Sequence, residues 1–115
     1  MNNAVLLPKA VYKSPDGSQQ QVTNYHIYNQ YIIRVENRDE LIKYLKENEI
    51  GCEIYYPVPF HKQECFQFLY GNSKESFEHS DFSAQKSLAL PIYPELTTEQ
   101  ITYIVETIKN FLNKV

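Results

Sequence analysis

The sequence predicts an α+β fold, in which a small, mostly antiparallel sheet carries helices packed on one face. Three observations predict it. Residues 27–35 have the pattern of a strand, residues 101–112 repeat apolar side chains at helical spacing, and strand-like and helix-like segments follow one another in between. The 115 residues provide for one domain with one core.

The first 23 residues form a lead-in, and the domain itself is placed at residues 24–115. A Pro-Asp-Gly turn signal at 15–17 stands between two short β-prone stretches. This pattern is typical of a short exposed hairpin. A lead-in without regular structure is the alternative.

A strand over 27–35 and a following helix are the first well-marked elements. β-forming residues dominate the strand, and apolar positions alternate along it. Asn37 is the predicted N-cap of the helix, with Glu40 as its capping-box partner. Gly51 follows the end of this helix, where a residue in the left-handed conformation is useful.

The middle of the chain predicts two strands and two short helices. The segments are a strand over 52–56, helices over 62–70 and 79–87, and a strand over 88–92. Pro57 and Pro59 stop the first of these strands, because proline cannot donate to a ladder.

The last helix has the clearest signals. Thr97 is its predicted N-cap, Gln100 completes a capping box, and Leu96 forms a hydrophobic staple with Ile101. Apolar side chains then recur at helical spacing and predict the inward face: Ile101, Ile104, Val105, Ile108, Phe111 and Leu112.

Composition and charge exclude several classes of protein. The net charge is −3 and no stretch concentrates Lys or Arg, so binding to nucleic acid through phosphate neutralisation is not expected. No apolar run approaches the ~20 residues of a membrane span, and the first residues do not resemble a signal peptide. We therefore expect a cytoplasmic protein. The two cysteines, Cys52 and Cys65, are expected to be reduced and mostly buried.

Metal binding and nucleophilic catalysis have weak support. His61 and Cys65 alone have a helical ligand spacing, so no metal site is predicted. With three glycines in the chain, neither a nucleophile elbow nor a phosphate-binding loop is present. The chain does not read as a complete enzyme.

The segment 55–63 is the strongest candidate site. It carries two phenols, an imidazole and a carboxamide on a backbone that its prolines hold extended. Flat rings and neutral hydrogen-bonding groups on a stiff backbone suit a hydroxyl-rich ligand such as a sugar. The alternative is structural: the tyrosines pack on the helices and the prolines only turn the chain. His26, Tyr28 and Asn29 form a second polar and aromatic cluster, at the start of the first strand.

Three motifs from about residue 24 to the end resemble one known family, the pyridoxal-phosphate-dependent DegT/DnrJ/EryC1/StrS sugar-nucleotide aminotransferases. Residues 26–35 with 38–41 look like the strand and helix that open its small domain. Residues 55–63 resemble its motif of His or Tyr followed by Tyr-Pro-x-Pro-Leu-His-x-Gln. Residues 88–97 with Glu99 and Gln100 are similar to its closing strand and last helix.

The resemblance implies the C-terminal small domain of a fold-type I aminotransferase. Such an enzyme converts a keto-sugar nucleotide to an amino-sugar nucleotide, with glutamate as the usual amino donor. The resemblance places the cofactor and its Schiff-base lysine in a large domain outside these 115 residues. The chain alone is therefore expected to be inactive and to bind no pyridoxal phosphate. The enzyme is expected to be a homodimer.

The same resemblance places Tyr55, Tyr56 and His61 nearest the sugar, with Gln63 in support. His26 and Asn29 match a segment that borders the same cleft. The chain departs from the motif at two positions. Phe60 stands where Leu is usual, and Tyr55 stands where many members have His, which argues against an acid–base role there.

A second class of function remains open at this point. A stand-alone small-molecule-binding or interaction module could keep the fold of this domain without catalysis. The DNA upstream distinguishes the two hypotheses, because a coding sequence for a large domain there favours the aminotransferase.

Overall fold

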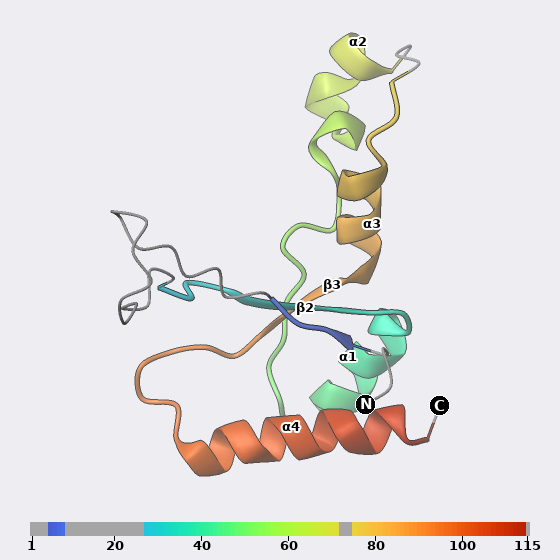
Figure 1. Ribbon diagram of the computed structural model, residues 1–115. Helices are drawn as coiled ribbons and strands as arrows, with labels where there is room; N and C mark the ends of the chain where they lie inside the picture. Colours follow the sequence, from blue (N-terminus) through green and yellow to red (C-terminus); the bar gives the residue numbers. More distant parts are fainter. Residues whose placement is uncertain (1–4, 9–26, 72–74, 115) are drawn as a thin grey trace, which may run out of the picture.

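The computed structural model describes residues 5–8, 27–71 and 75–114, and its centre is a three-stranded antiparallel sheet (Figure 1). The strands are β1 (Val5–Leu6), β2 (Tyr31–Val35) and β3 (Ser87–Leu90), in the order β1-β2-β3. β2 thus has a partner on each edge. The hairpin predicted within residues 1–23 lies outside the described residues. β1 has no sequence signal, because two residues are too few to show an alternation.

The hydrophobic core lies between one face of the sheet and two helices, α1 (Arg38–Glu47) and α4 (Thr98–Leu112). Ile33 on β2 pairs with Leu88 on β3, and both side chains are fully buried. The helices supply most of the remaining core: Leu41, Leu45, Ile104, Ile108 and Phe111. Each such side chain stabilises the fold by about 1.5–3 kcal/mol, so this face holds the domain together.

The opposite side of the sheet carries a projecting arm (Figure 1). The arm consists of the 3₁₀ turns η1 (Phe60–Lys62) and η2 (Glu64–Phe66) and the helices α2 (Gln67–Tyr70) and α3 (Glu78–Lys86). Arg34 on β2 faces this side, with its guanidinium carbon 5.8 Å from the centre of the Phe82 ring on α3. The predicted α+β class is confirmed, and α1 and α4 are the helices that cover the core face.

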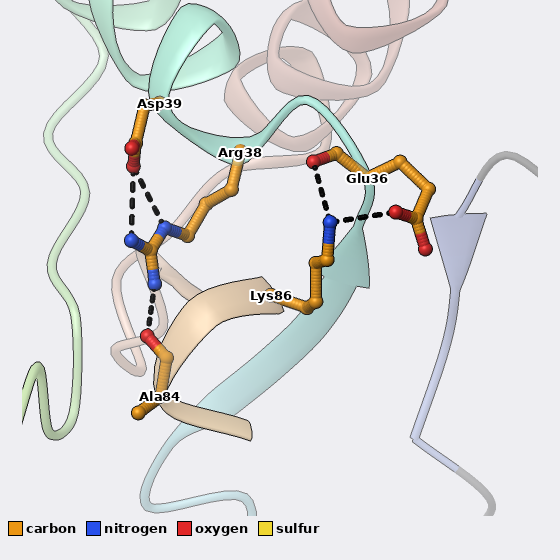
Figure 2. A network of polar contacts seen from close by, with 5 residues as sticks. All are labelled: Glu36, Arg38, Asp39, Ala84 and Lys86. Atoms are coloured by element: carbon orange, nitrogen blue, oxygen red, sulfur yellow. Dashed lines mark hydrogen bonds and ion pairs between the residues drawn. The ribbon is translucent and has the colours of Figure 1, made fainter. Parts of the chain in front are cut away.

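A polar network fixes the end of α3 against the turn between β2 and α1 (Figure 2). The Lys86 ammonium contacts Glu36 at its backbone oxygen (3.2 Å) and at Oε2 (2.6 Å). The Arg38 guanidinium donates to the backbone oxygen of Ala84 and pairs with Asp39 at 2.9 Å. The carbonyl of Ala84 belongs to the last turn of α3, where no backbone N–H of the helix remains to donate to it. The Arg38 guanidinium donates to this carbonyl instead.

α1 begins directly after Asn37, as predicted, but the predicted capping box is wrong. The Asn37 side chain makes no capping hydrogen bond, because its φ of −94° and ψ of 52° are not the extended conformation from which a cap reaches the first turn. At the other end Glu49, with a φ of 57°, takes the left-handed conformation that was expected of Gly51. The conformations of the turns before and after α1 therefore differ from those that Asn37 and Gly51 predict.

Two elements of the middle segment are shorter than predicted. The strand over 52–56 reduces to one bridge, in which Glu53 and Ala89 exchange backbone hydrogen bonds of 3.2 and 2.8 Å. α3 runs directly into β3 at Ser87, so residues after Tyr55 have no strand to pair with. The helix over 62–70 is interrupted because Gln63 is extended (φ −70°, ψ 140°), and only Gln67–Tyr70 is α-helical.

The capping box of α4 is confirmed. Two positions of the predicted inward face are wrong: Ile101 and Val105 are 47% and 42% exposed, and Thr107 is buried instead. The Thr107 hydroxyl can occupy the core because it donates to the backbone oxygen of Tyr103 (2.8 Å).

Both cysteines are free. Cys52 is half-buried, which raises the pKa of its thiol, whereas Cys65 is exposed and the expectation of burial is wrong for it.

Candidate functional site

The segment 55–63 leaves the sheet after the Glu53 bridge and runs along the base of the arm. Its prolines lack N–H donors, and the chain re-enters turn structure when Lys62 N–H donates to the backbone oxygen of Pro59 (2.9 Å). The peptide between Tyr55 and Tyr56 is cis, and the centres of the two rings are 5.9 Å apart. Tyr56 is 72% exposed and Tyr55 is 44% exposed. The segment thus presents two accessible phenols.

An open cavity of about 240 Å³ lies between this segment and α3. Its lining comes from two parts of the chain: Tyr55, Tyr56, Val58, Pro59, Phe60, Gln63, Ser80, Ser83 and Ala84. The polar groups are phenols, hydroxyls and a carboxamide, each able to donate and accept while uncharged. The apolar groups include flat ring faces. This surface suits a neutral, hydroxyl-bearing ligand.

His61 is held beside this cavity rather than in its lining. Its Nε2 lies 3.2 Å from Asp81 Oδ1 on α3, and its ring packs against Phe77 at a tilt of 31°, with the ring centres 4.6 Å apart. The Lys62 ammonium reaches the same Asp81 oxygen at 2.8 Å. A hydrogen bond from Lys62 is the main cause that lowers the pKa of Asp81 below its ordinary 3.8, and burial opposes it. His61 is therefore anchored to α3.

Tyr28 and Asn29 of the predicted second cluster do not line this cavity. Ala89 faces both Ile32 on β2 and Glu53. Both pairings are antiparallel, so the chain after Glu53 runs toward Ser87 and the chain before Ile32 runs toward Pro91. Asn29 is exposed and lies at that far end. His26 lies outside the described residues.

Ser80, Ser83 and Asp81 belong to the site, and sequence reasoning missed them. All three lie on α3, one turn or less apart. Serine and aspartate are ordinary residues on an exposed helix face. No local pattern links them to residue 61, which lies about 20 positions earlier.

A larger cavity of about 560 Å³ lies between the end of α1 and the start of α4. Its lining is mostly apolar and includes Ile50, Pro91, Leu96, Tyr103 and Ile104. It carries none of the residues of the motif at 55–63.

In the part of the chain that the structure describes, no three His, Cys, Asp or Glu side chains are grouped to hold a metal ion. No helix among these residues is long and apolar enough to cross a membrane.

The small antiparallel sheet with two helices on its core face matches the fold of one part of solved aminotransferases. A model of the DegT/DnrJ/EryC1/StrS aminotransferase family matches residues 6–109. The chain belongs to this family.

Relatives and solved structures agree with that assignment. The chain is 42% identical over 87 residues, 76% of its length, to a pleiotropic regulatory protein of Geobacillus stearothermophilus. It is 34% identical over 89 residues, 77% of its length, to a UDP-N-acetyl-3-dehydro-alpha-D-glucosamine 3-aminotransferase of Acidithiobacillus ferrooxidans. DesV of S. venezuelae, solved in complex with a ketimine intermediate, superposes with a TM-score of 0.78 over 97% of the chain at 24% identity.

The chain is short beside all three. It covers 23% of each of the two relatives and 27% of the DesV chain, about a quarter in every case. The similarity therefore concerns one part of these proteins.

Proposed function

We propose that this chain is the C-terminal small domain of a sugar-nucleotide aminotransferase, and that it closes the substrate side of the active site. The enzyme converts a keto-sugar nucleotide to an amino-sugar nucleotide, with glutamate as the amino donor. The named aminotransferase of Acidithiobacillus ferrooxidans supports a nucleotide-linked sugar as the substrate class.

The cavity beside residues 55–63 carries this proposal. Its phenols, hydroxyls and carboxamide offer a sugar several uncharged hydrogen-bonding partners, and its ring faces offer contact to the apolar side of a sugar ring. Tyr56 is the most exposed of the aromatic side chains in that lining, at 72%. This exposure leaves the Tyr56 phenol accessible to a ligand.

Pyridoxal phosphate is the cofactor that the family implies, and it supplies an electron sink for the transamination. The described lining of the cavity contains no lysine to form a Schiff base and no cation to hold a phosphate. The lining of this cavity therefore does not fit the cofactor. None of its nine lysines is given the role, which we assign to the large domain.

The test is Tyr56→Phe in the full-length aminotransferase that contains this domain. Losing one hydrogen bond to the sugar should cost about 1–3 kcal/mol of transition-state stabilisation, so kcat/KM for the keto-sugar nucleotide should fall roughly fivefold to a hundredfold. The half-reaction with glutamate should stay near normal, because glutamate does not contact the phenol. Single-turnover kinetics of each half-reaction measure the two effects separately.

Tyr93→Phe is the matched control, because Tyr93 is also exposed and lines only the larger cavity. It should leave both half-reactions unchanged. Equal losses in both half-reactions for Tyr56→Phe would assign this edge to the cofactor. No loss in either would leave the phenol without a role in the reaction, and the proposed site would be wrong.

A further inference from the structure

The helix α3 forms the second wall of the cavity beside residues 55–63. Ser80, Ser83 and Ala84 line this wall, and their spacing of three and four residues places them on one face of the helix. Ser80 is exposed and Ser83 is half-buried. Two serines of α3 therefore share the cavity with Tyr55 and Tyr56 of the segment 55–63.

The hydroxyls of these two serines have no hydrogen-bond partner among the described residues. A hydroxyl on a helix often donates to the backbone carbonyl four residues earlier. Thr102 and Thr107 on α4 both do so, at 2.8 Å. Ser80 and Ser83 make no such bond within the described chain, so their hydroxyls remain available to a ligand.

The phenols of the opposite wall are available in the same sense. The hydroxyl of Tyr103, beside the larger cavity, donates to the backbone oxygen of Asn48 at 3.2 Å. In the described part of the chain the hydroxyls of Tyr55 and Tyr56 have no such acceptor. Four hydroxyls that can each donate and accept therefore surround one cavity, and the hydroxyls of a sugar ring have the same two capacities.

The described lining of this cavity carries no charged side chain. Lys62 belongs to the segment 55–63, but its ammonium is engaged with Asp81 at 2.8 Å. A diphosphate is usually bound by Arg or Lys side chains, which match its negative charge. The cavity therefore suits the uncharged sugar ring of a sugar nucleotide better than the diphosphate.

We propose that Ser80 and Ser83 are specificity-determining residues, which hydrogen-bond to hydroxyl groups of the sugar ring while the nucleoside diphosphate lies outside this cavity. This role rests on the proposed function. Ser83 is the stronger determinant, because a half-buried hydroxyl has less access to water when the ligand offers it no partner. The two serines thus discriminate between sugars that differ in one hydroxyl.

The first test measures the full-length enzyme with the keto-sugar nucleotide. Ser83→Ala should lower kcat/KM roughly threefold to tenfold, the effect of one hydrogen bond between uncharged groups. The half-reaction with glutamate should be unchanged, and so should the inhibition constant of the free nucleoside diphosphate (UDP for a UDP-linked sugar). Alanine is the best helix former, so α3 should persist.

Ser76→Ala is the matched control, because Ser76 is an exposed serine just before α3 and does not belong to the described lining of the cavity. It should leave the two half-reactions and the inhibition constant unchanged. Ser80→Ala should act in the same direction as Ser83→Ala and by a smaller factor, because Ser80 is the more exposed of the two.

The second test removes the hydroxyls of the substrate one at a time. For the deoxy analogue that lacks the partner of Ser83, wild type and Ser83→Ala should have the same kcat/KM, because the hydrogen bond is already absent. For the other deoxy analogues the variant should keep its full defect. Ser83→Thr, which retains a hydroxyl, should recover part of the rate with the complete substrate.

The outcomes separate failure of this role from failure of the proposed function. Normal sugar turnover in both serine variants, together with the loss expected for Tyr56→Phe, overturns the role of the serines and leaves the proposed function in place. A rise in the inhibition constant of UDP equal to the loss in kcat/KM, or a defect that persists with every deoxy analogue, overturns the contact with the sugar. No loss in any of the three variants overturns the proposed site as well. A loss confined to the sugar half-reaction and absent for one deoxy analogue supports the role.

Discussion

Thr97 and Gln100 exchange two hydrogen bonds at the start of α4. The Gln100 backbone N–H donates to the Thr97 hydroxyl oxygen (3.2 Å), and the Thr97 backbone N–H donates to Gln100 Oε1 (2.9 Å). Thr97→Ala removes the first and should lower the free energy of unfolding by ~1 kcal/mol. Urea unfolding at one protein concentration measures it. Thr98→Ala, next to it on the exposed surface, should change stability by less than half as much, and equal effects would contradict the cap.

At the scale of elements, α3 is attached to η1 through Asp81. The folded pKa of Asp81 is lowered from 3.8, chiefly by Lys62, so the folded state binds its proton less readily than the unfolded state does. The contact therefore stabilises the arm above about pH 4 and is lost as the pH falls through the lowered pKa. Amide chemical shifts of α3 and η1 followed by NMR should change in that acidic range before those of α4 do.

In Asp81→Asn, the amide shifts of the arm should no longer change at a different pH from those of α4, because the amide side chain does not titrate. Glu78→Gln, at the start of the same helix, should preserve it. Acid transitions of the arm that are identical in wild type and Asp81→Asn would mean that other carboxylates control the attachment of α3.

At the scale of the molecule, the arm carries apolar side chains that the described chain does not cover. Phe68 is 81% exposed, Phe60 65% and Leu69 57%. A projecting surface of this kind is normally covered by a partner, and in the proposed enzyme the rest of the polypeptide or a second subunit would do so. We therefore expect the isolated chain to self-associate, with sedimentation velocity showing dimers or larger species at micromolar concentration.

Phe68→Gln should shift this equilibrium toward monomer, because it removes the most exposed ring. Ile101→Gln, on the exposed face of α4, is the control and should leave the equilibrium unchanged. A wild-type monomer at every concentration, with cooperative unfolding and high stability, would favour the independent binding module over a domain of a larger enzyme.

The sequence by itself determined the elements whose causes are local. The cap at Thr97 and the apolar repeat of α4 act over three or four residues, and the alternation in β2 acts over two, so each is visible in a short window. The family motif at 55–63 is also local, and it located the tyrosines that line the cavity.

Tertiary structure decided whatever depends on a distant partner. Glu53 alone bridges to β3, which begins at Ser87 directly after α3. The Asn37 side chain does not cap α1, because its backbone lies in the turn that Arg38 and Lys86 hold against α3. His61 meets Asp81 across 20 residues, which no local pattern encodes. These contacts arise only when the chain has packed, because their energies depend on burial and geometry that one segment cannot specify.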